Sequence, residues 1–293
     1  MKTCTLYELA APAKLNLFLH VTGRRDDGYH LLQSVFVLID WCDQLHIERR
    51  EDARIARHDL TVALPEDDLC IKAARALQSA SGTSMGADIH IEKRVPWGAG
   101  LGGGSSDAAT TLLALNRLWG LNWPRERLAQ IALTLGADVP FFIGGRNAWV
   151  EGIGERLTPI DVPARWWAVL KPAVVVPTSA IFASRDLVRD TPPAILFDFL
   201  ADPARLLKPG SFGRNDLQPP AMAYSSEVGE ALALLQAHFG ASRMSGSGSA
   251  VFAEAGAGES PERSMPEATA LPAGWVGRMC RGLDRHPLWD WAV

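Results

Sequence analysis

The stretch PWGAGLGGGSSD, residues 96–107, decides how this chain of 293 residues is interpreted. Five of the seven residues at 98–104 are glycine, which tolerates positive φ and lets the backbone approach a ligand without an intervening Cβ. An alternating strand pattern precedes the stretch at 87–95, and a helical pattern follows at 107–119. Backbone N–H groups at such a strand-to-helix turn, together with the helix dipole, form an anion site. The stretch therefore predicts a phosphate-binding loop.

Three other interpretations compete with this one. A flexible linker would not usually lie between a well-patterned strand and helix. Gly98, Gly100 and Gly103 match the dinucleotide fingerprint GxGxxG, but that fold needs an acidic residue about twenty positions further on, at the end of a second strand. Here that region, 123–135, has a helical pattern. A P-loop needs Gly-Lys-Ser/Thr, and no lysine follows Gly104. The loop therefore matches neither common phosphate-binding type.

Composition limits the class of protein and its partners. Hydrophobic residues make up 47% and charged residues 21%, as in ordinary globular proteins. A chain of 293 residues tends to divide into two domains. The net charge is -4 and the pI is about 6.0, so no nucleic-acid partner is predicted.

Cysteine spacing and hydropathy predict where the protein works. The four cysteines contain no CxxC pair, which argues against zinc knuckles and thioredoxin-like chemistry. Residues 1–8 contain no long apolar region, and no apolar run approaches the roughly 20 residues that span a bilayer. These observations predict a cytoplasmic protein with free thiols and no membrane partner.

The remaining patterns favour an α+β fold, because strands and helices alternate without a regular βαβ rhythm. Leu15, Leu17 and Leu19 alternate with other residues and predict a half-buried strand. Two prolines in a polar stretch at 157–163 predict a boundary between domains 1–160 and 161–293. Further strands are expected at 35–39, 166–176, 250–254 and 274–282, helices at 67–79 and 226–238, a second glycine-serine loop at 245–249, and an exposed loop with a short helix at 256–272.

The loop at 98–106 closely resembles the ATP loop of the GHMP kinases, the family of galactose, homoserine, mevalonate and phosphomevalonate kinases. PAKLNLFL at 12–19 and GYHLLQS at 28–34 resemble the branch that phosphorylates a cytidyl diphosphate-linked methylerythritol on the non-mevalonate route to isoprenoids. Trp97 and Ala99 depart from the family pattern, where Met or another apolar residue and Gly are usual, and Ala99 would resist positive φ. The resemblance continues at 135–142, 151–155, 177–182, 215–217, 245–248 and 281–283.

This resemblance implies a two-domain fold. An N-terminal domain like domain 2 of ribosomal protein S5 would be followed by a ferredoxin-like α/β sandwich, with the active site in the cleft between them. The implied reaction moves the γ-phosphoryl group of ATP to the 2-hydroxyl of the substrate. Mg²⁺ would arrive with ATP and keep water and phosphate ligands, so no protein metal site is expected. The implied partner is a small molecule, and the protein would be a monomer or a homodimer.

The resemblance also assigns roles to single residues. Asp138 would be the base or the orienting carboxylate for the attacking hydroxyl, and Lys14 would pair with it and stabilise charge on the phosphoryl group. Without the resemblance, Asp138 could be a helix N-cap before Pro140, and Lys14 could extend to water from a strand edge. The implied ATP-binding residues are Pro96, Trp97, Gly98, Ala99, Gly100, Leu101, Gly102, Gly103, Gly104, Ser105 and Ser106.

Another set of residues would bind the acceptor substrate. Tyr29 would stack on the pyrimidine ring, His30 would read the edge of the ring, and Phe182 would supply the opposite stacking face. Phe182 could instead be an ordinary core residue. Asn16, which lies on the same strand face as Lys14, would bind erythritol hydroxyls or a phosphate. The full implied set is Asn16, Tyr29, His30, Thr178, Phe182, Ser245 and Gly246.

Two further functions stay open at this stage. The chain could be a GHMP kinase that acts on a different alcohol, although Tyr29, His30 and Phe182 favour a ring-bearing substrate. It could also be a relative that senses a nucleotide without turnover, although the presence of both Lys14 and Asp138 argues against this.

Overall fold

The computed structural model describes residues 4–201 and 213–292, and within them ten strands join one sheet. The central path of the sheet runs β3-β4-β2-β10-β7-β9-β8, while β1 pairs with β2, and β5 pairs with β2 and β6. The strands are β1 (Thr5–Arg24), β2 (His30–Arg50), β3 (Ile55–Asp59), β4 (Gly86–Glu92), β5 (Ala148–Glu151), β6 (Arg156–Pro159), β7 (Trp166–Lys171), β8 (Arg243–Met244), β9 (Val251–Gly256) and β10 (Val276–Leu283).

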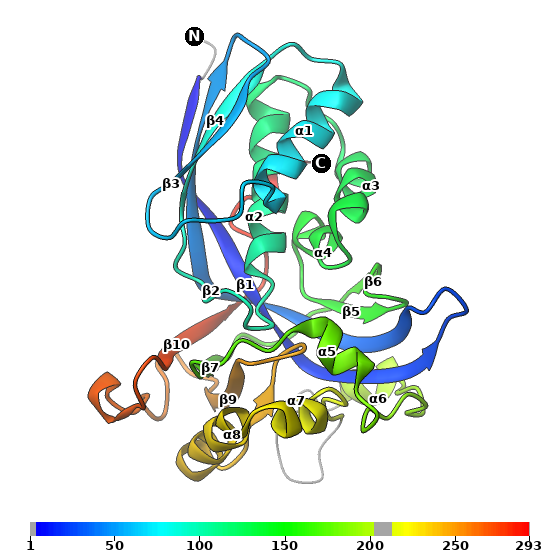
Figure 1. The fold of residues 1–293 in the computed structure, drawn as a ribbon, viewed down its shortest axis with the longest axis vertical. Helices are drawn as coiled ribbons and strands as arrows, with labels where there is room; N and C mark the ends of the chain where they lie inside the picture. Colours follow the sequence, from blue (N-terminus) through cyan, green and yellow to red (C-terminus); the bar gives the residue numbers. More distant parts are fainter. Residues whose placement is uncertain (1–3, 202–212, 293) are drawn as a thin grey trace.

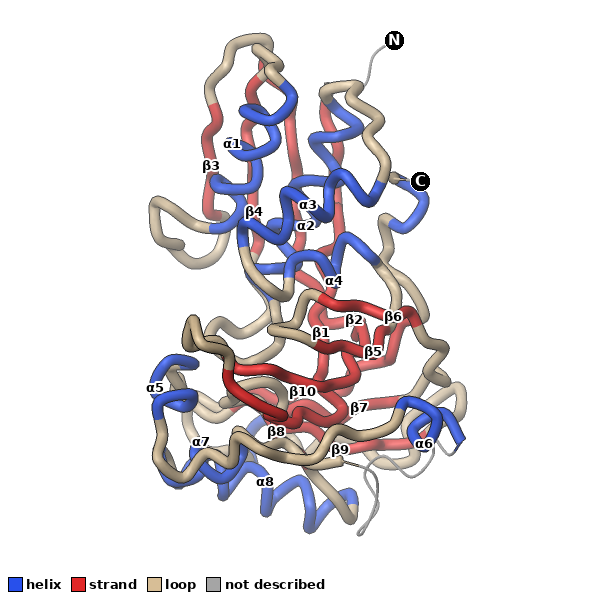
Figure 2. The backbone as a smooth tube through the Cα atoms, turned by 90° about the vertical axis from the view of Figure 1, so that its right-hand side faces the viewer, coloured by secondary structure: helices blue, strands red, loops and turns tan. Residues whose placement is uncertain are grey.

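Helices lie in two groups at opposite ends of this sheet (Figure 1). One group packs on β1 and β2 around a buried apolar cluster, and consists of α1 (Leu69–Ser81), α2 (Gly103–Leu118), α3 (Arg125–Leu135) and α4 (Val139–Gly144). The second group comprises α5 (Thr178–Ala183), α6 (Leu196–Ala201), α7 (Gln218–Tyr224) and α8 (Ser226–Phe239), and Figure 2 shows α8 lying beneath β7, β8 and β9. Two short 3-10 helices are η2 (Ala268–Ala270) and η3 (Trp289–Trp291).

The long strand β2 connects the two groups. Its C-terminal half pairs with β4 over residues 44–50, while Leu38 and Ile39 pair with β10 and residues 34–36 pair with β5. The antiparallel ladder between β1 and β2 extends along most of both strands. The two halves of the chain therefore share one continuous backbone hydrogen-bond network, at whose centre β1 carries Lys14 and Asn16.

The glycine-rich stretch forms a turn followed directly by a helix. Gly98, Gly100 and Gly102 have φ of 64°, 72° and 72°, a conformation that disfavours any side chain. Ala99 is not among the residues with positive φ, so its departure from the usual glycine causes no backbone strain. Helix α2 begins at Gly103 and not at the predicted residue 107. Residues 103–106 therefore form the first helical turn, in which Ser106 N–H donates to the carbonyl of the N-cap residue Gly102 at 2.9 Å, while the N–H groups of residues 103–105 have no partner within the helix.

Most of the predicted elements are present. Asp68 caps α1 by accepting a hydrogen bond from the backbone N–H of Ile71, as its acidic start suggests. The helices predicted at 123–135 and 226–238 correspond to α3 and α8, and the strand predicted at 35–39 lies in β2. The strands predicted at 87–95, 250–254 and 274–282 overlap β4, which ends at Glu92, β9 and β10. The second glycine-serine loop joins β8 to β9, and η2 is the short helix expected in 256–272.

Two strand predictions need correction. The strand at 15–19 is buried on both faces and not half-buried, because Asn16 and Phe18 are as inaccessible as the leucines between them. The strand predicted at 166–176 ends at Lys171, because Pro172 has no N–H group to donate to the ladder.

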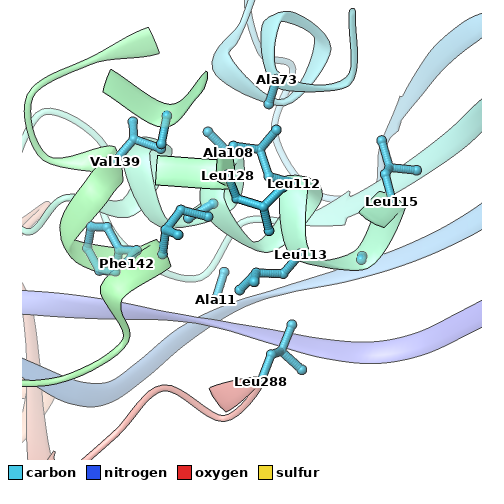
Figure 3. Packing of buried hydrophobic residues seen from close by; sticks show 14 of the residues in the cluster. Ala11, Ala73, Ala108, Leu112, Leu113, Leu115, Leu128, Val139, Phe142 and Leu288 are labelled. Atoms are coloured by element: carbon cyan, nitrogen blue, oxygen red, sulfur yellow. The ribbon is translucent and has the colours of Figure 1, made fainter. Parts of the chain in front are cut away.

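The domain boundary predicted at 157–163 stays a prediction. Part of that stretch forms β6, which pairs with β5. The chain also returns to the first group of helices, where Leu288 and Ala292 join the same apolar cluster. Figure 3 shows Leu288 in this cluster. No helix in the part of the chain that is described is long and apolar enough to cross a membrane.

Candidate active site

A cavity of about 220 Å³ lies where β1, β2, the glycine turn, α4, α5 and the β8–β9 loop meet. A second hollow of about 200 Å³ lies over the glycine turn and the start of α2. The two hollows share Gly98, Gly100 and Gly102. Such a pair can hold an acceptor on one side of the turn and a polyphosphate on the other. Of the predicted site residues, the cavity is lined by Lys14, Asn16, Gly98, Gly100, Gly102, Asp138, Thr178, Phe182 and Gly246.

The two predicted catalytic residues lie together on the cavity wall. Lys14 Nζ is 3.6 Å from Asp138 Oδ2 and lies 4.6 Å from the centre of the Phe36 ring. It also donates a hydrogen bond to Asn16 Oδ1. Burial lowers the pKa of Lys14, and the nearby Asp138 carboxylate opposes that shift. The Lys14 ammonium is therefore buried, and the Asp138 carboxylate beside it is 33% exposed.

Asn16 and Ser245 connect this wall to the glycine turn. The backbone N–H of Asn16 donates to Ser245 Oγ at 3.2 Å, and Ser245 Oγ donates to the carbonyl of Gly100 at 3.0 Å. Asn16 Nδ2 donates to Ser34 Oγ at 3.1 Å. Gly100 cannot carry a side chain here, since an added Cβ would lie 2.2 Å from the carbonyl oxygen of Ser245. The predicted contact of the second glycine-serine loop with the site is thus explained by close backbone packing.

The floor of the second hollow contains a buried charge cluster. Lys93 Nζ donates to Asp43 Oδ2, and to Asp107 Oδ2 at 2.6 Å. Asp43 also accepts hydrogen bonds from the backbone N–H groups of Arg94 and Val95, at 2.6 and 2.8 Å. Burial raises the pKa of Asp107. This cluster fixes the strand that leads into the glycine turn to the first turn of α2.

The second hollow suits a phosphate chain with its metal ion. The glycine turn leaves the backbone uncovered, and the first N–H groups of α2 point out of the helix end. Ser106 Oγ is buried and has no hydrogen-bond partner among the described residues. Ser106 lines neither hollow, whereas Ser105, its neighbour on the first turn of α2, lines the second hollow. No group of three or more His, Cys, Asp or Glu residues in the described ranges could hold a metal ion.

The predicted pyrimidine-binding residues are only partly brought together. Phe182 lines the cavity, and its ring stacks on His30 with centroids 4.9 Å apart. His30 Nε2 accepts a hydrogen bond from Arg189 Nε at 3.1 Å, and burial and Arg189 lower the pKa of His30. Tyr29 is 60% exposed and does not line the cavity. The placement of a cytosine between Tyr29 and Phe182 therefore stays a prediction.

Four contributors to the site are not among the single residues assigned from the sequence, although Ser34 and Ser247 lie in the segments 28–34 and 245–248 that resemble the family. Ser34 and Phe36 hold Asn16 and Lys14 from β2, Ser247 exchanges a 2.8 Å hydrogen bond with Thr178, and Lys93 forms part of the floor. Ser34 ends the segment at 28–34 that resembles the family, and this position could have drawn attention to it. Nothing local distinguishes Lys93 from a surface lysine, because its partners lie 50 and 14 residues away.

Comparison with known proteins assigns this geometry to a family. The chain matches the GHMP kinases N terminal domain at residues 68–146 and the GHMP kinases C terminal domain at residues 200–268. It is 70% identical over 292 residues to the 4-diphosphocytidyl-2-C-methyl-D-erythritol kinase of Methylibium petroleiphilum, with 100% of each chain covered. The protein of that name from Variovorax paradoxus is 55% identical, with 98% of this chain and 99% of that protein covered.

A solved structure supports the same relationship. The crystal structure of a 4-(cytidine 5'-diphospho)-2C-methyl-D-erythritol kinase is 37% identical and superposes with a TM-score of 0.79, covering 94% of this chain and 98% of that one. The expected two-part α+β kinase fold, with an N-terminal and a C-terminal GHMP domain, is confirmed. The chain belongs to the GHMP kinases, and within them to the family of 4-diphosphocytidyl-2-C-methyl-D-erythritol kinases.

Proposed function

We propose that this ATP-dependent kinase transfers the γ-phosphoryl group of ATP to the 2-hydroxyl of 4-diphosphocytidyl-2-C-methyl-D-erythritol and so forms the 2-phosphate. The observation that carries the proposal is the Lys14–Asp138 pair, which lies on the wall of the cavity. This cavity shares three glycines with the second hollow, which we call the phosphate hollow. The printed names of the relatives supply the identity of the acceptor.

The residues around the cavity divide the work. Asp138 accepts the proton of the attacking hydroxyl or orients that hydroxyl, while Lys14 offsets negative charge on the phosphoryl group during its transfer. The glycine turn and the first turn of α2 hold the phosphates through backbone N–H groups. Mg²⁺ that enters with ATP supplies further charge neutralisation, and Ser105 and Ser106 are the hydroxyls that would meet its water shell or the phosphate oxygens.

The acceptor is recognised on the opposite side of the glycine turn. Asn16, held by Ser34 and Ser245, meets the polyol or its phosphates. Phe182 offers an aromatic face for the cytosine ring, with Thr178 next to it on α5. We further propose that the enzyme acts in the cytoplasm on this small molecule alone, without nucleic acid, as a monomer or homodimer. Light scattering on the purified protein measures the oligomeric state.

A direct competition tests the substrate. Purified protein receives ATP, Mg²⁺ and equal concentrations of the cytidyl compound, mevalonate and homoserine, and ADP and phosphorylated products are followed. We expect phosphorylation of the cytidyl compound alone. Folded protein that releases no ADP contradicts kinase activity, whereas preferential phosphorylation of another alcohol assigns the chain to a different GHMP reaction.

Asp138→Asn separates a kinase from a nucleotide sensor. It should lower kcat by about 100-fold, within the typical contribution of a general base, and leave ATP binding intact. If turnover is unchanged, the proposed role of Asp138 is wrong.

A further inference from the structure

Apart from its pair with Lys14, Asp138 takes its position from α4 and not from a capping bond of its own. It is the N-cap residue of that helix, and its side chain makes no capping hydrogen bond. The helix has six residues, and Val139, Pro140, Phe141, Phe142 and Ile143 are buried. At about 1.5 Å per residue, the far end of α4 lies roughly 9 Å along the helix from the backbone of Asp138. A shift at that end therefore moves Asp138 as well.

The far end of α4 is held by an arginine that has no part in the cavity. Arg125, the first residue of α3, donates a hydrogen bond from Nη1 to the carbonyl of Ile143. The same guanidinium donates from Nη2 to the carbonyls of Trp289 and Ala292, at 2.5 and 2.7 Å. Burial lowers the pKa of Arg125. One side chain thus joins the last turn of α4 to the final residues of the chain.

The C-terminal segment 284–292 completes this attachment. The backbone N–H of His286 donates to the carbonyl of Gly145, the residue that ends α4, at 2.8 Å. Gly145 has φ of 63°, and a Cβ there would meet the Trp289 ring at 3.0 Å and His286 at 3.3 Å. The Trp289 ring lies 4.4 Å from the Arg125 guanidinium. Figure 1 shows the C-terminus ending beside α2 and α3, on the side of the molecule that carries α4.

We propose that Arg125 and segment 284–292 form a clasp that positions Asp138 for phosphoryl transfer. Neither Arg125 nor any residue of the segment lines the cavity or the phosphate hollow. The clasp therefore acts through α4 and contacts no substrate. This inference rests on the proposed role of Asp138. It makes Arg125 a positioning residue and gives segment 284–292 a function in catalysis.

If the clasp had only a structural role, its removal would lower the stability of the protein and leave kcat per folded enzyme unchanged. The test therefore measures turnover and folding separately. Arg125→Met removes the three hydrogen bonds and keeps an apolar side chain over Trp289. Arg127→Met is the matched control, because Arg127 lies on the same helix, 3.3 Å from the centre of the Trp123 ring. We expect Arg125→Met to lower kcat about 10- to 100-fold, with both KM values within about twofold, since a misplacement near 1 Å costs up to about 100-fold. Arg127→Met should retain the kcat of the parent.

A double variant then shows whether Arg125 acts through Asp138. In the Asp138→Asn background, Arg125→Met should cause almost no further loss of kcat, because residues that act as one unit are not additive. Arg125→Lys should recover only part of the rate, since an ammonium cannot donate to three carbonyls in the fork geometry of a guanidinium. Thermal unfolding reports the folded fraction of each variant.

Two results overturn the inference while the proposed function stands. The first is that Arg125→Met has the same kcat per folded enzyme as the parent. The second is that Arg125→Met lowers kcat by the same factor in the parent and in the Asp138→Asn enzyme. If Asp138→Asn alone retains full kcat, both the clasp and the role of Asp138 are wrong. If Arg125→Met fails to fold, Trp289→Leu takes its place, because it keeps apolar bulk but removes the ring beside the guanidinium. The same measurements are made on it, and the same results would support or overturn the inference.

Discussion

Lys14→Met separates the catalytic contribution of this lysine from its effect on stability. Lys14 is 3% exposed, and its ammonium lies between Asp138, Asn16 and the Phe36 ring. Methionine fills a similar volume and places a thioether against the aromatic ring, a favourable contact. The substitution therefore removes the positive charge while largely conserving the packing.

The expected change in stability is small, because two effects oppose each other. Loss of the hydrogen bond leaves Asn16 Oδ1 without that donor, which costs about 1–3 kcal/mol for a buried acceptor. Removing a buried ammonium is favourable, since burial lowers the pKa of Lys14, and each tenfold drop in proton affinity corresponds to about 1.4 kcal/mol. Asp138 is 33% exposed and stays hydrated. The free energy of unfolding should therefore stay within about 2 kcal/mol of the parent.

The expected change in activity is larger. Removal of one preorganised electrostatic group typically lowers kcat by about 100- to 1,000-fold, or about 2.7–4 kcal/mol of transition-state stabilisation. The assay couples ADP release to NADH oxidation at saturating ATP and acceptor, with thermal unfolding measured in parallel. Lys171→Met is the control. That lysine is also buried, with its pKa lowered by burial, but it donates to the carbonyls of Ala173 and Val174 and lines neither hollow.

The pH dependence of the parent gives a second check on Lys14. Because its folded-state pKa lies below the 10.5 of a free lysine, the ammonium is lost at a lower pH than in the unfolded chain. The value of kcat/KM, which reports the pKa values of the free enzyme, should fall as the pH rises through that folded-state pKa, and Lys14→Met should lack this alkaline limb. In the same window, up to pH 10.5, the stability of the parent rises with pH, since only the unfolded chain still binds the proton. A folded Lys14→Met enzyme with kcat within threefold of the parent would refute the assigned role.

Three substitutions probe the two sides of the glycine turn. Gly100→Ala combines positive φ with a Cβ 2.2 Å from the Ser245 carbonyl, so it should lower the melting temperature and raise KM for ATP at least tenfold; unchanged values contradict the close packing. Gly103→Val places a branched side chain in the second hollow, with its Cβ 3.2 Å from Val95 Cγ1 and 3.4 Å from Asp43 Oδ2 and Lys93 Nζ, and should raise KM for ATP; an unaltered KM argues against the loop assignment. Phe182→Ala should raise KM for the cytidyl acceptor about tenfold and leave that for ATP unchanged, whereas the reverse pattern would exclude ring stacking at this residue.

The phosphate site was predictable because its determinants are local. Five glycines between a strand and a helix specify an uncovered backbone whatever the rest of the chain does. The start of α2 was not predictable to the residue, because Gly103 and Gly104 are poor helix formers yet open the helix. Burial of Asp107 beneath the turn, against Lys93, favours the helical backbone over the intrinsic preference of these two glycines.

The acceptor side depended on contacts between distant segments. Residue spacing places Asn16 and Lys14 on one strand face, but nothing in the sequence shows that Ser34 and Ser245 hold Asn16 from 18 and 229 residues away. Helix α4 illustrates a different limit. Pro140 near its start is a helix signal, but six residues are too few for a helical period to be recognised.

The charges around the two hollows bear on how ATP binds. Lys14 is paired with Asp138, and Lys93 with Asp43 and Asp107, so these five groups carry a formal net charge of -1 when all are ionised and of 0 when Asp107, whose pKa is raised by burial, is protonated. Among the described residues that line the hollows, no other lysine or arginine is present. Backbone N–H groups supply only partial positive charge. ATP therefore has to bring its own counter-cation, and calorimetric titration in Mg²⁺ should show affinity at least tenfold higher than titration with a chelator present. Equal affinity in the two buffers would mean that the helix end and the glycine turn alone neutralise the phosphates.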